Sequence, residues 1–259
     1  MVTAILLVEK ALPNSITSFH DLLSNELPKT SGKWSFELKI YLNNKYSKPD
    51  NFNVQQVPNK YLVTLTTSYL PNKTISMINN TKAIMTSSYL SSNDEIDHFE
   101  KGCCNSTSLD PFDFIISNKF QNLWNLKQSI RGEGGNSYEI TVNNLNINDP
   151  NIIQSLPKEL IEEVNNTYDT FRIRTANCSL HGSFKGFLIE IEYIDKEEAK
   201  DKTSDYNEIQ QFHIKINKIK ELIKQYKFPN GKLCYNVLNE DKLDYISDLV
   251  QQYSEALQF

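Results

Sequence analysis

Two glutamates one residue apart, Glu190 and Glu192, are the strongest candidates for chemistry in this sequence. They fall in the segment Phe187 to Ile194, where apolar and polar residues alternate, so both carboxylates should project from one face of a β-strand. Inside a barrel such a pair could hold a divalent cation through oxygen ligands and promote phosphate hydrolysis. A site of this kind requires further carboxylates from neighbouring strands, and no second Glu-x-Glu occurs in the sequence.

The surroundings of the pair favour a structural interpretation. The adjacent strand candidates carry basic residues and one further acid on their polar faces: Lys127, Arg131, Arg172, Arg174 and Glu139. Residues of opposite charge that face each other across strands form ion pairs. We therefore expect Glu190 and Glu192 to pair with basic side chains and not to bind a metal.

No other group of residues has the spacing of a catalytic or metal site. The histidines (His20, His98, His181, His213) and cysteines (Cys103, Cys104, Cys178, Cys234) are scattered. A zinc site needs two matching pairs of ligands, and no second pair accompanies Cys178-x-x-His181 or His98 with Cys103-Cys104. The sequence also lacks the Gly-x-Ser-x-Gly elbow that holds the nucleophile of serine hydrolases. Gly132-Glu133-Gly134-Gly135 precedes a strand and not a helix, so it indicates a hairpin turn and not a phosphate loop. The sequence predicts no catalytic, metal or cofactor-binding residues, and no enzyme.

Composition narrows the class of protein. The net charge is -5 and the pI is near 5.5, which argues against a dedicated nucleic-acid site, because such affinity depends on Lys and Arg. The apolar run Ala4 to Val8 is too short for a signal segment or a membrane span. Few cysteines, two of them adjacent, indicate reduced thiols in the cytosol or nucleus.

Hydrophobic periodicity predicts the elements that position these residues. Strands are expected at 3–9, 33–42, 61–67, 74–78, 82–86, 127–131, 137–142, 170–178 and 184–194, with the first covered on both faces. Helices are expected over an apolar stripe from Ile16 to Leu27, over 112–124, and over two C-terminal stripes, Ile209 to Tyr226 and Ile246 to Leu257, separated by Pro229-Asn230-Gly231. The two C-terminal stripes pack on the chain's own core or contribute part of a subunit interface.

These elements predict a single α+β domain over residues 1–259, with C-terminal helices at about 205–259. About nine strands leave costly edges in an open sheet, so a curled antiparallel β-barrel with flanking helices is the expected architecture. A polar surface loop is expected at 91–110, and an insertion between strands at 146–166.

Four segments together resemble subunit 20 of the fungal Mediator complex. They are AILLVEKALPNSITSFHDLLSNELPKTSGKWSFELKIY (4–41), SNKFQNLWNLKQSIRGEGGNSYEI (117–140), SFKGFLIEIEYI (183–194) and ISDLVQQYSEALQF (246–259). The insertion 146–166, the loop 91–110 and the polar stretch 43–59 depart from the family pattern.

The resemblance implies a β-barrel related to that of Mediator subunit 18, with which this family pairs directly in the head module. Subunit 8 tethers that submodule to the other head subunits. The resemblance also implies a nuclear transcription coactivator that acts on the RNA polymerase II machinery, with the TATA-binding protein as a further candidate contact, and no membrane association. The family barrel is similar to that of metal-dependent RNA triphosphatases, which makes such a phosphohydrolase the alternative function.

Overall fold

The computed structural model describes residues 2–47, 58–87, 105–107, 112–143, 145–147, 150, 153, 168–194, 208–240 and 242–258. One mostly antiparallel sheet contains ten strands in the order β10-β1-β9-β8-β7-β2-β3-β4-β5-β6. The strands are β1 (Val2–Val8), β2 (Lys29–Asn43), β3 (Tyr61–Thr67), β4 (Lys73–Ile78), β5 (Ile84–Ser87), β6 (Asn105–Thr107), β7 (Trp124–Val142), β8 (Asp169–Leu180), β9 (Ser183–Ile194) and β10 (Lys232–Cys234). The helices are α1 (Pro13–Ser24), α2 (Phe112–Phe114), α5 (Glu208–Gln225) and α6 (Tyr245–Ala256), with short turns η1 (Lys45–Ser47) and η3 (Ile115–Lys119). The α+β class is confirmed.

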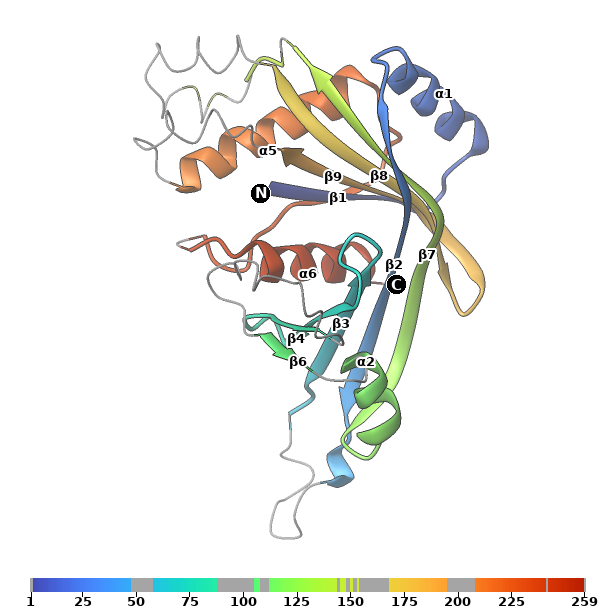
Figure 1. The fold of residues 1–259 in the computed structure, drawn as a ribbon, viewed down its shortest axis with the longest axis vertical. Helices are drawn as coiled ribbons and strands as arrows, with labels where there is room; N and C mark the ends of the chain where they lie inside the picture. The colour runs from blue at the N-terminus through green and yellow to red at the C-terminus, as the bar shows by residue number, and fades with distance from the viewer. Residues whose placement is uncertain are drawn as a thin grey trace.

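The sheet is strongly curled, and helices cover both of its faces (Figure 1). Helix α6 lies in the hollow, where its apolar residues pack between β1 and β10 on one side and β3 and β4 on the other. Helices α1 and α5 cover the outer face of β1, β8 and β9. We call the face toward α6 the inner face and the opposite one the outer face.

Strand β1 is apolar except at Thr3, because both of its faces are covered. Ile5 and Leu7 belong to the inner core, whereas Ala4 and Leu6 belong to the outer core. All its residues from Val2 to Val8 are buried, as expected for a strand between two layers. The predicted strand is confirmed.

The expected closed barrel is not confirmed. The strand order is linear, with β10 at one end and β6 at the other, so the sheet remains open among the described residues. The long strands β2 and β7 run through both arms of the curl, and register shifts along β2 and β7 mark the bulges at which such strands bend. Helix α6 fills the space that strand pairing would otherwise close.

The predicted hairpin at Gly132 to Gly135 is wrong, because β7 continues through these glycines as one strand. A methyl group at Gly132 would lie 2.1 Å from a ring carbon of Phe36, and one at Gly135 would lie 2.5 Å from the carbonyl oxygen of Trp34. Glycine is therefore required by close approach of β2, and only Gly134, at φ +67°, uses the left-handed region.

Other expectations were wrong in extent. The helix predicted over 112–124 ends at Lys119, where a π-helical turn terminates it, and Trp124 already begins β7. Leu27 lies beyond α1 and is exposed, so the apolar stripe stops earlier than predicted.

Strands β6 and β10 were not predicted. Strand β6 lies within the expected loop 91–110, most of which falls outside the described residues. Most of the insertion 146–166 also falls outside them.

No helix in the described residues is long and apolar enough to cross a membrane.

Candidate functional site

Glu190 and Glu192 project together from the inner face of β9 into the interior, next to α6. Their neighbours Ile189 and Ile191 point into the outer core, so the predicted alternation is confirmed. Both glutamates are 0% exposed. Burial of two carboxylates at this depth demands compensating charge and hydrogen bonds.

Arg174 on β8 supplies that compensation. The strand register places it directly opposite Glu190. Its guanidinium donates to a carboxylate oxygen of Glu190 and, at 2.6 Å, to Oε2 of Glu192. A second arginine, Arg172, lies 3.4 Å from Glu192 Oε2 and 3.4 Å from Glu139 Oε2. The predicted cross-strand ion pairs are thus confirmed for Arg172, Arg174 and Glu139.

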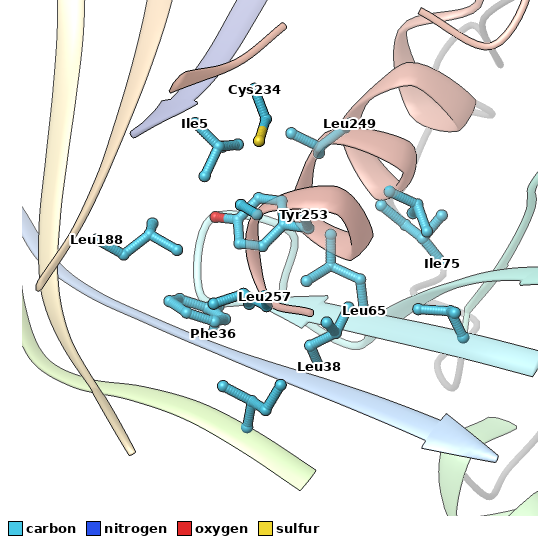
Figure 2. Packing of buried hydrophobic residues seen from close by; sticks show 14 of the residues in the cluster. Ile5, Phe36, Leu38, Leu65, Ile75, Leu188, Cys234, Leu249, Tyr253 and Leu257 are labelled. Atoms are coloured by element: carbon cyan, nitrogen blue, oxygen red, sulfur yellow. The ribbon is translucent and has the colours of Figure 1, made fainter. Parts of the chain in front are cut away.

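Tyrosines complete the interior cluster and connect it to distant parts of the chain. The hydroxyl of Tyr253 on α6 donates to Glu190, and the Tyr69 ring, in the turn between β3 and β4, lies 4.0 Å from the Arg174 guanidinium carbon. Figure 2 shows Tyr253 among Ile5, Phe36 and Leu188, which surround it with apolar side chains. The cluster therefore ties α6 and the β3–β4 turn to the centre of the sheet.

The electrostatics of the cluster follow from burial. Burial raises the pKa of Glu190, although the charge of Arg174 opposes this effect. Burial alone would lower the pKa of Arg174, but the two carboxylates outweigh it and raise the pKa. Arg174 is therefore permanently charged and holds the carboxylates in place.

The cluster does not have the composition of a metal site. Where a cation would sit between the two carboxylates, the Arg174 guanidinium already contacts both. Among the described residues no group of three or more His, Cys, Asp or Glu side chains could hold a metal ion. One oxygen, Oε1 of Glu192, is buried without a hydrogen-bond partner in the described part of the chain. The arrangement therefore compensates the two buried carboxylates with arginine and tyrosine donors of the chain itself.

The remaining candidates lie apart from this cluster. Arg131 pairs with Glu37 on the outer face at 2.9 Å, and Lys127 is exposed near the start of β7. Cys178 and Cys234 are buried free thiols, and burial raises the pKa of Cys178 to about 12. His98, Cys103 and Cys104 lie outside the described residues.

Two features of the interior escaped sequence reasoning. Tyr69 and Tyr253 come from segments far from β9 in the chain, and no local pattern marks them. A second buried ion pair, Asp169 with Lys218 at 2.9 Å, joins β8 to α5 on the outer face, where Tyr193 also donates to Asp169 at 2.7 Å. In the sequence, the only sign of this ion pair is that Lys218 falls within the apolar stripe of α5.

Comparison with known proteins decides the family. The model for the TATA-binding related factor (TRF) of subunit 20 of Mediator complex matches residues 1–155 and 160–258. The chain belongs to the Mediator subunit 20 family. The match spans both chain ends, including β1 and α6, and it agrees with the resemblance of the four sequence segments.

Individual relatives extend the match over the whole chain. Mediator of RNA polymerase II transcription subunit 20 from Debaryomyces hansenii is 36% identical over 273 residues, covering 100% of both chains. The protein of the same name from Scheffersomyces stipitis is 35% identical, also over 100% of both, and that from Saccharomyces cerevisiae is 22% identical over 99% and 98%. Among solved structures, PH1819 from Pyrococcus horikoshii is 10% identical with a TM-score of 0.35, over 96% of this chain and 99% of its own. Membership of this family supports a role in transcription as part of Mediator.

Proposed function

We propose that this chain is a non-enzymatic subunit of the Mediator head module that pairs directly with subunit 18. Subunit 8 would connect this pair to the other head subunits. In this role the chain acts in the nucleus as a coactivator component, and it supports initiation by the RNA polymerase II machinery and its regulation. The TATA-binding protein is a further candidate contact.

The observation that carries the proposal is the family match over nearly the whole chain. The interior lends no support to a catalytic role for the glutamate pair. Glu190 and Glu192, the residues with the most catalytic character in the sequence, are 0% exposed and are paired with Arg174. A side chain locked in this way cannot reach a substrate unless its surroundings unfold.

The proposal is tested by affinity purification of the tagged chain from yeast cells, followed by identification of the bound proteins by mass spectrometry. Subunits 18 and 8 and other head subunits are expected in the same fraction. Their absence, with the tagged chain present and folded, would contradict the proposal.

The rival function is a metal-dependent RNA triphosphatase. It predicts release of phosphate from triphosphate-ended RNA with Mn²⁺ or Mg²⁺, lost in Glu190→Ala. We expect the purified chain to release none. Metal-dependent release that this substitution abolishes, in a variant whose circular dichroism spectrum shows it still folded, would establish the rival and remove the structural role assigned to the carboxylates.

A further inference from the structure

The first residues of β7 form an open sheet edge. Trp124 to Leu126 pair with β2 on one side, at Asn43, Leu42 and Tyr41. On the other side β8 begins to pair only at Ile130, through Leu180. Figure 1 shows this end of β7 extending past β8 toward α2. Among the described residues, Trp124 to Leu126 thus have strand pairing on one side only, and Lys127 lies at the register shift between Leu126 and Gln128. The amide of Trp124 already donates to the carbonyl of Phe120 at 3.0 Å, so the template for an added strand is the stretch from the Trp124 carbonyl through Leu126.

Large apolar side chains are exposed beside this edge. Phe114, Phe120, Leu123 and Leu126 are between 43% and 49% exposed. Phe120, Leu123 and Leu126 follow one another from the end of η3 into β7, where the amide of Leu123 donates to the carbonyl of Phe120 at 2.9 Å, and Phe114 precedes them in α2. Clustering of exposed apolar side chains at one place marks a contact surface more often than scattered ones do.

A small core holds this region in a fixed shape. Tyr41, Leu62 and Ile116 form a buried cluster against which Phe112 and Trp124 pack. Lys39 pairs with Asp113 at 2.7 Å and anchors α2 to the sheet. The edge and its apolar side chains are therefore presented on a preformed platform, which lowers the entropic cost of binding.

The local charge is opposite to that of the chain as a whole. The chain carries -5, yet between Phe112 and Ser129 the only acid is Asp113, which is already paired with Lys39. Lys119 and Lys127 are exposed in the same stretch. An incoming segment with acidic side chains would meet a favourable field here.

We infer that this β7 edge surface, made of Phe114, Phe120, Leu123, Leu126 and Lys127, binds an acidic, extended segment of a partner protein. The segment adds as a strand along Trp124 to Leu126, next to Lys127. Its main chain pairs with the open edge, its apolar side chains contact the exposed leucines and phenylalanines, and its carboxylates face the lysines. This site is separate from the interior cluster and does not depend on pairing with subunit 18.

The test measures fluorescence anisotropy of a labelled synthetic peptide of about ten residues, in which Glu alternates with Leu and Phe, on titration with the full-length chain. A dissociation constant on the order of 10 to 100 µM is expected. Leu126→Asp and Lys127→Glu should each weaken binding about tenfold, because each removes one apolar or ionic contact. N-methylation of alternate peptide amides should abolish binding, because it removes the main-chain donors.

Matched controls keep the outcome decisive. Leu12→Asp and Lys10→Glu change an exposed leucine and an exposed lysine in the turn before α1, and should leave the affinity unchanged. The inference is overturned if the peptide does not bind, if the control variants weaken binding equally, or if Leu126→Asp has no effect. It is also overturned if single-stranded RNA or a lysine peptide binds more tightly, or if light scattering shows that Leu126→Asp dissolves a homodimer of this chain.

Discussion

Replacement of Arg174 by Met should destabilise the chain strongly. The substitution keeps an unbranched side chain in the interior and removes the charge that both Glu190 and Glu192 contact. The side chain of Arg174 is 4% exposed, so solvent cannot replace the lost interactions.

The expected loss of stability follows from the two buried carboxylates that stay behind without Arg174. Removal of one partner from a buried ion pair costs about 3 to 5 kcal/mol, because it leaves an uncompensated charge. Arg172, at 3.4 Å from Glu192, compensates for part of this, whereas loss of the contact with Tyr69 adds about 0.5 to 2 kcal/mol. We expect the free energy of unfolding to fall by about 3 to 5 kcal/mol at pH 7.

The pH dependence provides a second signature. Burial already raises the pKa of Glu190 in the folded chain, and removal of Arg174 should raise it further. A carboxyl with a raised folded pKa costs stability above that pKa, and the cost disappears as the pH falls and the group is protonated. The deficit of Arg174→Met should therefore be smaller at about pH 5 than at about pH 7.

The assay is urea unfolding followed by circular dichroism at both pH values. The matched control is Arg131→Met, since Arg131 also pairs with a glutamate but its side chain is 57% exposed, and its loss should cost less than about 1 kcal/mol. A deficit for Arg174→Met that is no larger than that of the control, or that does not change with pH, would refute the assignment of Arg174 as the central compensating charge.

Three further substitutions or titrations test other parts of the account. Tyr253→Phe removes only the donor to a buried carboxylate and should lower the free energy of unfolding by about 1.5 to 3 kcal/mol in urea titrations; no change would mean that this hydrogen bond is not formed. Burial raises the pKa of Asp248 to about 6, so its carboxyl resonance should titrate near that pH by NMR. Because the folded chain then binds this proton more tightly than the unfolded chain, Asp248 should add stability as the pH falls from about 6 to about 4. An NMR midpoint near 4 would contradict the burial of this carboxyl. Gly132→Ala should cost about 1 to 3 kcal/mol in thermal unfolding because its methyl group overlaps the Phe36 ring, whereas a neutral effect would mean that the ring moves aside freely.

The sequence predicted most strands because their alternation reports which face each residue occupies. In β9, Glu190 and Glu192 lie on the face opposite Ile189 and Ile191, as the period of two requires. The pairing of the glutamates with arginines on β8 was also predictable, because the two strands are joined by a short turn at His181 and so must lie side by side.

The misplaced hairpin shows where local reasoning fails. Glycines at Gly132 and Gly135 look the same in sequence whether they serve a turn or make room for a neighbouring strand. The deciding contacts, with Phe36 and Trp34 on β2, come from residues about a hundred positions earlier in the chain.

The tyrosines of the interior cluster were missed for a related reason. Tyr253 reads as one more apolar position in the stripe of α6, and its partner Glu190 is 63 residues away. The expected closure of the barrel is not confirmed among the described residues, because the number of strands alone does not reveal that a helix occupies the hollow.

The mass of the complex formed on co-expression with subunit 18 tests the central claim most directly. Light scattering of the co-purified sample should give one copy of this 29.9 kDa chain per copy of subunit 18. A well-behaved monomer that elutes separately from subunit 18 would contradict the account.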